Sequence, residues 1–402
     1  MSSLRSTAWR RSVRRGSIAL AALAAVALLP ADGSAATRDV VAVGNAFAGT
    51  VSFLDANTYT NLGSINVVPD LASRKFILFL NPVTLAGYQV VKSQKGGENY
   101  VDDVALSPDG KTLYVSRGIL EDVAAFNLVT KKMIWRTNIG GFEADHMAIT
   151  ADGGRVFVSD ITNGLVKAFN TANGQVVGHF AGGTYTHEVD FSPDGKRVYV
   201  GSIGTTALPY LMNSLKGDRQ LTIADANTYQ VLRTYKFDYG LRPDILTPDE
   251  TTMYFQLSYH RGFIEFDLAS GTITRTKDLP GTLAGDLLFP DLLPANSMHH
   301  GLALSGDGRT ICNAGTIDNY IAMVDRSTFN TNKLVSGFAK PYWAETSRDG
   351  TKCLVSNSDG DYVSVMDYVT GLEVKRTTVG DYPQRERNGR LDTTIILSAN
   401  PG

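Results

Sequence analysis

Cysteine, tryptophan and histidine are scarce in this sequence. Its 402 residues include two cysteines, three tryptophans and six histidines. No Cys-x-x-Cys-His segment is present, which excludes a c-type haem attachment site. The Gly-x-Ser-x-Gly nucleophile turn, the His-Glu-x-x-His zinc helix and the glycine-rich phosphate loop are also absent. Beyond the first 36 residues, no apolar run approaches the roughly 18 residues of a membrane-spanning helix. The sequence therefore predicts no membrane span and lacks the motifs of several common enzyme classes.

The first 36 residues have the order of a secretory signal peptide. Five arginines precede twelve apolar residues, 18–29, and a small-residue stretch, 33–36, follows. We expect cleavage after Ala36 and a mature protein that is secreted or periplasmic. Paired arginines at 10–11 and 14–15 leave a twin-arginine leader open as the alternative to the general secretory route.

The charge of the mature chain limits its partners. Without residues 1–36, 33 lysines and arginines face 39 aspartates and glutamates, a net charge of −6. A negative chain is a poor match for nucleic acid or for an anionic membrane surface. We therefore expect no nucleic-acid partner; the expectation of a small-molecule ligand or substrate comes from the ring and insertions described below.

Seven alternating apolar segments each end in aspartate or asparagine. Their β-branched and aromatic residues at a period of two predict strands. A short polar side chain at the end of each segment can bond the backbone of a following turn. The seven terminal residues are Asp55, Asn127, Asn170, Asp225, Asp267, Asp325 and Asp367.

Turns of the Ser-Pro-Asp-Gly type alternate with these segments. From Asp109 onward, successive turn aspartates are 43, 42, 55, 58 and 42 residues apart. A period near 40 with four strands per repeat is typical of a β-propeller. We predict an all-β fold, a single seven-bladed propeller of four-stranded antiparallel blades over residues 37–402.

The turn and the Val-x-Val-x-Asp strand that follows it resemble the repeat of the bacterial YVTN-type (YncE-like) seven-bladed β-propellers. Clear copies are 105–116 and 189–200, and the resemblance covers essentially the whole mature chain. It implies the propeller fold. The family includes secreted binding proteins, surface-layer modules and relatives of quinoprotein amine dehydrogenase subunits, so the resemblance selects no function.

The two ends of the chain are expected to share blade one. Segment 40–43 reads as a second strand and 51–55 as a third, so the innermost strand is missing at the N-terminus. We expect residues around 383–391 to supply it, which would leave no open sheet edge. The cysteines, Cys312 and Cys353, fall on second strands of neighbouring blades, where a disulfide and two buried apolar side chains are equally compatible with the sequence.

Two residues of each blade, five and four before the turn serine, mark the entrance of the innermost strand. Because innermost strands surround the central axis, these side chains should converge at one mouth of the channel. The pairs are Asp102 and Asp103, Asp145 and His146, His187 and Glu188, Arg242 and Pro243, His300 and Gly301, Tyr342 and Trp343, and, in the closing blade, Asp381 and Tyr382.

Three insertions, 67–100, 203–219 and 280–298, connect strands on the same face as this ring. We expect long loops without regular structure, which usually act as lids or binding loops. They would place a partly apolar rim over a polar floor, as a small-molecule site requires. The same face is the expected contact surface for any protein partner. The rim residues are Phe76, Phe79, Tyr88, Tyr210, Leu211, Met212, Phe289 and Met298.

Imidazoles and carboxylates from different blades can share a divalent transition metal or transfer protons. A histidine or glycine at this position is also a common structural residue of the repeat, and an aspartate there can simply accept from neighbouring backbone N–H groups. The candidate catalytic residues are His146, His187, His300 and Glu188, and the same three histidines are the candidate metal ligands. The candidate ligand-binding residues are Asp102, Asp103, Asp145, Arg242, His299, Tyr342, Trp343 and Glu345.

Two functions stay open on this evidence. The first is an exported propeller that binds a small organic ligand, with or without a divalent metal, and performs no chemistry. The second is an enzyme that uses the same ring for acid/base lyase, isomerase or hydrolase chemistry, or a subunit similar to those of quinoprotein dehydrogenases. Both functions need the same convergent polar groups.

Overall fold

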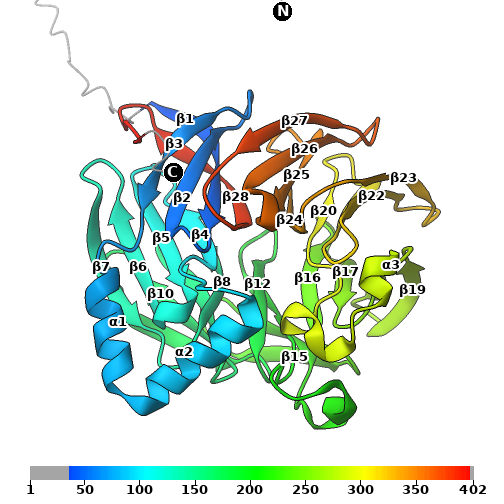
Figure 1. Ribbon diagram of the computed structural model, residues 1–402, viewed down its shortest axis with the longest axis horizontal. Coiled ribbons are helices and arrows are strands. Elements are labelled where there is room, and N and C mark those ends of the chain that lie inside the picture. Colours follow the sequence, from blue (N-terminus) through cyan, green and yellow to red (C-terminus); the bar gives the residue numbers. More distant parts are fainter. Residues whose placement is uncertain (1–35, 399–402) are drawn as a thin grey trace, which may run out of the picture. The chain divides into compact units, whose positions relative to one another are not determined.

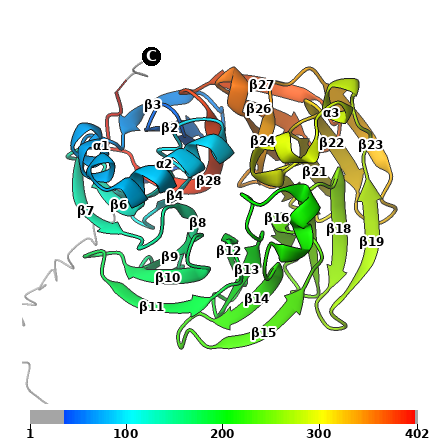
Figure 2. The same ribbon diagram turned by 60° about the horizontal axis from the view of Figure 1, so that its bottom comes forward.

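The computed structural model describes residues 36–398, which form seven four-stranded antiparallel blades in a ring (Figures 1 and 2). The fold predicted from the repeats is therefore confirmed. The expected signal peptide lies outside the described residues, apart from Ala36. None of the helices within 36–398 is long and apolar enough to cross a membrane.

Each blade runs from an innermost strand at the central channel to an outermost strand at the rim. Blades one to four contain β28 (Pro383–Asp392), β1 (Thr37–Asn45), β2 (Thr50–Asp55) and β3 (Asn61–Asn66); β4 (Asp103–Leu106), β5 (Thr112–Arg117), β6 (Asp122–Asn127) and β7 (Lys132–Asn138); β8 (Ala144–Ile149), β9 (Arg155–Asp160), β10 (Leu165–Asn170) and β11 (Val176–Ala181); β12 (Thr186–Phe191), β13 (Arg197–Ser202), β14 (Gln220–Asp225) and β15 (Val231–Lys236). Blades five to seven contain β16 (Leu241–Leu246), β17 (Thr252–Leu257), β18 (Gly262–Asp267) and β19 (Thr272–Asp278); β20 (Leu302–Leu304), β21 (Thr310–Gly315), β22 (Tyr320–Asp325) and β23 (Thr331–Ser336); β24 (Pro341–Thr346), β25 (Lys352–Asn357), β26 (Tyr362–Asp367) and β27 (Glu373–Thr378).

The repeat residues perform the local roles expected of them. All seven predicted Asp and Asn residues are the last residues of the third strands. At the first of them, Asp55 Oδ1 accepts hydrogen bonds from the backbone N–H groups of Asn57 and Thr58 at 3.0 and 2.9 Å. At the first Ser-Pro-Asp-Gly turn, the N–H of Gly110 donates to the carbonyl of Ser107 at 2.9 Å. These bonds satisfy the backbone groups that the ladder leaves open.

Apolar side chains hold neighbouring blades together. Seven buried clusters each join two adjacent blades, and the one between blades seven and one includes Val41, Val43 and Leu354. Cys312 on β21 and Cys353 on β25 form a disulfide between blades six and seven, with their Cα atoms 6.5 Å apart. The sequence left open a disulfide or two buried apolar side chains, and the structure contains the disulfide.

The C-terminal strand closes the ring as predicted, but in a different register. β28 pairs antiparallel with β1, from Thr37 opposite Asp392 to Val43 opposite Glu386. The segment 387–389, which resembles a degenerate turn, is part of this continuous strand because β28 pairs with β1 and needs no hairpin of its own. Gln384 and Arg385 therefore occupy the ring positions of the closing blade, and the assignment of Asp381 and Tyr382 to the ring was wrong.

The insertions contain helices, contrary to the prediction of long irregular loops. The first forms α1 (Leu71–Leu80) and α2 (Pro82–Lys95), and Asn81 begins α2 by accepting from the N–H of Val83, with Pro82 at the first helical position. Tyr88 and Val91 of α2 pack into a cluster with residues of blade two. The remaining short helices are η1 (Gly118–Leu120), η2 (Tyr210–Leu215), α3 (Leu283–Asp286), η3 (Pro290–Leu292), η4 (Pro294–Asn296) and η5 (Ser358–Gly360).

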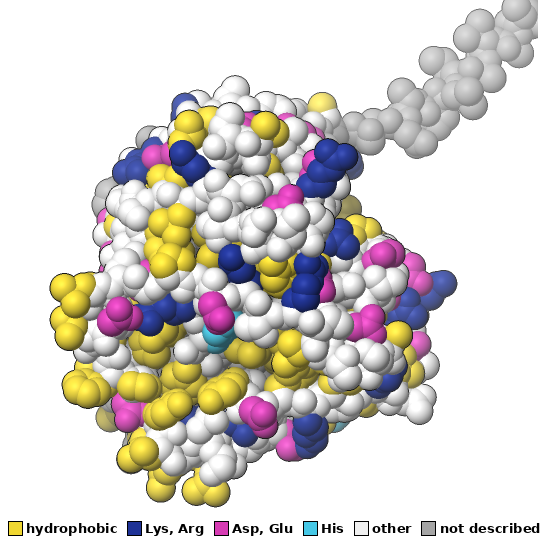
Figure 3. All heavy atoms as spheres, turned by 90° about the vertical axis from the view of Figure 1, so that its right-hand side faces the viewer, with side chains coloured by type: hydrophobic (Ala, Val, Ile, Leu, Met, Phe, Trp, Pro, Cys, Tyr) yellow, Lys and Arg dark blue, Asp and Glu magenta, His cyan; other side chains and the backbone are white. Residues whose placement is uncertain are grey.

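The three insertions contact one another. The hydroxyl of Thr206 donates to Gln94 Oε1 at 2.9 Å, and Lys216 Nζ donates to Asn296 Oδ1 at 2.8 Å. Hydrophobic side chains gather at the end of the molecule that carries these segments (Figure 3), where Leu211 is 94% exposed and Phe289 is 72% exposed. The insertions thus form one cover with an apolar outer surface.

Candidate functional site

The innermost strands present the ring residues through a repeated irregularity. In β8 the pairing with β9 shifts between Ala144 and Met147, and in β12 the pairing with β13 shifts between Thr186 and Val189. The same shift occurs in β16, in β24 and between β1 and β28. Such bulges re-aim side chains out of the regular alternation. The two residues inside each bulge are the ring pair, which explains why they reach the channel.

Three candidate residues from different blades come together at the channel mouth. His146 of β8, His187 of β12 and His300, just before β20, each offer one nitrogen, and these nitrogens lie within 4.8 Å of one another. The ring centroids of His146 and His187 are 4.1 Å apart, and those of His187 and His300 are 5.5 Å apart. All three imidazoles are buried.

The three imidazoles are held in the neutral form. Burial lowers the pKa of each well below the ordinary 6.5, and positive charges add to this effect: Arg385 at His146, and Arg242 at His187. At His300, Arg385 and Arg242 both contribute to the low pKa. A neutral imidazole has one nitrogen with a free lone pair, so each of these side chains can serve as a metal ligand or as a base.

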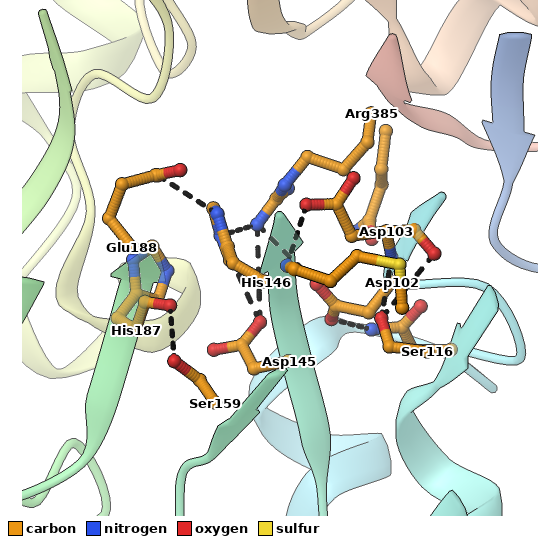
Figure 4. A network of polar contacts seen from close by, with 12 residues as sticks. Asp102, Asp103, Ser116, Asp145, His146, Ser159, His187, Glu188 and Arg385 are labelled. Atoms are coloured by element: carbon orange, nitrogen blue, oxygen red, sulfur yellow. Dashed lines mark hydrogen bonds and ion pairs between the residues drawn. The ribbon is translucent and has the colours of Figure 1, made fainter. Parts of the chain in front are cut away.

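His146 has a neighbouring side chain at each ring nitrogen (Figure 4). The guanidinium of Arg385 donates to His146 Nε2, and His146 Nδ1 lies 2.9 Å from Glu188 Oε2. Burial, with the neighbouring charge of Asp190, raises the pKa of Glu188 well above its usual range. The pair therefore places a carboxyl group of raised pKa against a neutral imidazole.

Lys95 reaches the same mouth from the end of α2. Its Nζ lies 3.0 Å from Asp102 Oδ2, 2.9 Å from Glu143 Oε1 and 3.6 Å from Asp145 Oδ1. Burial alone would lower the pKa of Lys95, but these three carboxylates raise it well above 10.5, so the lysine is charged. Nothing in the sequence identifies it, because a lysine at a helix end is usually a surface residue.

Arg385 was not among the predicted site residues. Its Nη2 lies 3.4 Å from Asp102 Oδ1 and 4.0 Å from Asp145 Oδ1, and its guanidinium stacks over the ring of Trp343 at 4.6 Å. The unusually charged segment 384–390 was the sequence signal for this residue. The register assumed for the closing strand concealed it.

Several predicted residues lie deeper in the channel. Asp103 pairs with Arg387 at 2.5 Å, and Glu345 Oε1 accepts from Asn388 at 2.8 Å. Burial raises the pKa of Glu345 to about 7. These residues belong to a second layer beneath the histidines, where Arg387 also lies 3.8 Å from Glu188.

His299 does not join the other three histidines. Its Nδ1 contacts the side-chain amide of Asn313 at 3.1 Å, and its Nε2 lies 3.4 Å from Asp318 Oδ2. Tyr342, in contrast, belongs to the mouth, because its ring stacks on that of His300 with the centroids 4.2 Å apart.

Arg242 lies at the mouth without a carboxylate partner. It is buried, and among residues 36–398 no carboxylate oxygen lies within 4.0 Å of its guanidinium. Its hydrogen bonds go to the hydroxyl of Ser258, at 3.2 Å, and to the carbonyl of Ala295. Burial lowers its pKa to about 10, with the charge of Arg385 acting in the same direction.

A pocket of about 640 Å³ lies between the insertions. Its lining includes Gln94 and Gly96, on either side of Lys95, and Ala295, whose carbonyl binds Arg242. A slightly larger pocket of about 690 Å³, lined by Tyr210 and by residues of β18 and β19, includes Ser258, whose hydroxyl accepts from Arg242. Neither pocket is lined by a ring residue. Both pockets therefore reach a partner of Arg242, and the first also flanks Lys95.

Comparison of the sequence with known protein families and with curated proteins finds no match. Among solved structures, the chain is similar to a chain of the hydrazine synthase of Kuenenia stuttgartiensis, with a TM-score of 0.55 and 16% sequence identity. The match covers 74% of this chain and 96% of that one. At this identity the likeness concerns the fold alone.

Proposed function

We propose that this protein is a ligand-binding propeller that holds a divalent transition metal ion at its channel mouth, between His146, His187 and His300. The observation that carries the proposal is the convergence of three neutral, buried imidazole nitrogens within 4.8 Å of one another. Three histidines with an open position form a common donor set for zinc and related ions.

The remaining contacts fit such an ion. Both nitrogens of His300 and Nδ1 of His187 are buried without a hydrogen-bond partner among the described residues, so these rings can turn a nitrogen to the ion. In this proposal His146 binds the ion through Nε2, which requires that Arg385 leave this nitrogen; His146 Nδ1 lies beside Glu188. Asp102 and Asp145, both near that guanidinium, are available to receive it.

A titration of metal-free protein with Zn²⁺ or Co²⁺, followed by calorimetry, tests the proposal. We expect about one ion per chain for the wild type. The His187→Ala/His300→Ala variant should bind at least tenfold more weakly, a loss of about 1.4 kcal/mol. Exposed His179, changed to Ala, is the matched control. Unaltered binding with a large loss of stability in the double variant would mean that the histidines are structural.

One contact favours enzyme chemistry as a second candidate function. His146 and Glu188, 2.9 Å apart, form a proton-transfer pair in a closed site, the arrangement used in general acid/base catalysis. Glu188→Gln should then abolish turnover of any substrate found while leaving metal affinity within about threefold. Full activity in that variant would remove the acid/base role.

Three further expectations accompany this proposal. The repeat supports membership of the YVTN-type family, and the leader sequence supports export to the periplasm or beyond. The exposed apolar side chains of the insertions support a protein partner on that face. Isolation of the protein from the periplasmic fraction, in complex or alone, would test the last two together.

A further inference from the structure

We propose that the ligand of this site is a small organic acid, whose carboxylate binds between Arg242 and Arg385 and whose body occupies the pocket between the insertions. The inference deepens the proposed function, on which it rests, by naming the ligand class of the same site.

The unpaired charge of Arg242 carries the inference. A guanidinium buried without a counter-ion is costly, and buried charges in proteins are normally paired. The other cations of the mouth have carboxylates nearby, since Lys95 is 3.0 Å from Asp102 and Arg385 is 3.4 Å from the same residue. Arg242 has only a hydroxyl and a carbonyl. Among the described residues, the guanidinium of Arg242 therefore has no carboxylate partner within 4.0 Å.

Arg385, the other arginine of the proposed site, has unused hydrogen-bond donors. Nε and Nη1 of Arg385 are buried and have no hydrogen-bond partner among residues 36–398. A carboxylate is an acceptor with two oxygens and about four lone-pair directions, and arginine binds it with short, charge-assisted hydrogen bonds. A neutral or cationic ligand would leave these donors and the charge of Arg242 unsatisfied.

The adjoining pocket favours an organic acid over an inorganic anion. Its volume of about 640 Å³ suits a small organic molecule. Ala295 lines this pocket and also binds Arg242 through its carbonyl, so the guanidinium lies next to the pocket. A divalent ion at the three histidines would add positive charge beside Arg242 and strengthen the preference for an anion.

The test compares succinate, benzoate and inorganic phosphate by calorimetry and by the rise in melting temperature that each produces. We expect a carboxylate to bind the wild type and to bind Arg242→Gln at least tenfold more weakly. Arg233→Gln, which changes an exposed arginine of β15, should behave as the wild type. Arg242→Lys, which keeps the charge, should retain part of the affinity, and this outcome guards against a variant that fails to fold.

Each result has a defined meaning. Binding of phosphate but not of carboxylates would support an oxyanion site and contradict the proposal that its ligand is an organic acid. Equal carboxylate affinity in Arg242→Gln and in the wild type, or no anion binding at all, would overturn the inference. The titration is made on metal-free and on Zn²⁺-loaded protein: carboxylate binding without Zn²⁺ binding contradicts only the metal site, whereas Zn²⁺ binding without carboxylate binding contradicts only this inference.

Discussion

Replacing His187 and His300 by alanine should change how the stability of the metal-free protein depends on pH. In an unfolded chain a histidine titrates near pH 6.5, whereas in the folded protein the pKa of both imidazoles lies well below this value. Below pH 6.5 the unfolded state therefore binds more protons than the folded state. Stability that these histidines provide above pH 6.5 is lost as the pH falls.

The size of this effect follows from proton linkage. Each imidazole that stays neutral in the folded protein at pH 5.5 weakens folding by about 1.4 kcal/mol relative to pH 7.5. For two histidines the sum is about 2.7 kcal/mol. Because Glu188 and Asp145 have raised pKa values in both proteins, their opposite contribution largely cancels in the comparison.

Urea denaturation of wild type and double variant at pH 7.5 and 5.5, with a chelator present, measures the difference. We expect the wild type to lose about 2.7 kcal/mol more than the variant between the two pH values. Exposed His179, changed to Ala, controls for the loss of an imidazole at the surface. An equal loss in both proteins would refute the argument that the mouth histidines are neutral.

The remaining predictions concern the frame of the site and the leader. Leu391→Ala removes a fully buried side chain of β28 and should cost about 3 kcal/mol, or about 4 °C in Tm for a domain of this size, whereas Leu211→Ala at the surface should not; equal effects in thermal melts would contradict the closure. Cys312→Ser should cost about 4 kcal/mol, because the disulfide closes a loop with a sequence separation of 41 residues, and unchanged urea denaturation would contradict the covalent link. N-terminal sequencing should show that the exported protein begins at Thr37. Retention of residues 1–36 would contradict the predicted signal peptide.

The fold could be predicted from the sequence because its signals are local and repeated. An aspartate such as Asp55 accepts from the backbone N–H groups two and three residues ahead, so a few adjacent residues determine the end of each third strand. The ring histidines could also be predicted from the sequence, since His146, His187 and His300 occupy equivalent or neighbouring positions in the repeat. Their positions in the blades predict which side chains face the axis.

The rest of the site depends on long-range contacts that the repeat does not encode. Lys95 reaches Asp102 only because α2 folds over the mouth, and the irregular loop expected there concealed that helix. Arg385 belongs to a strand whose partner, β1, lies more than 300 residues away, so its register could not be read from a hairpin turn. His299 is adjacent to His300, yet its side chain turns toward Asp318.

The most direct test of the metal site is anomalous X-ray scattering from crystals soaked with Zn²⁺ or Co²⁺. The account predicts a single strong anomalous peak at the channel mouth, with a nitrogen of His146, His187 and His300 each at about 2.0–2.1 Å from the ion. It also predicts that Arg385 will have moved from His146 toward Asp102 and Asp145. The absence of an anomalous peak at the channel mouth would contradict the central claim, whether or not the ion binds elsewhere on the protein.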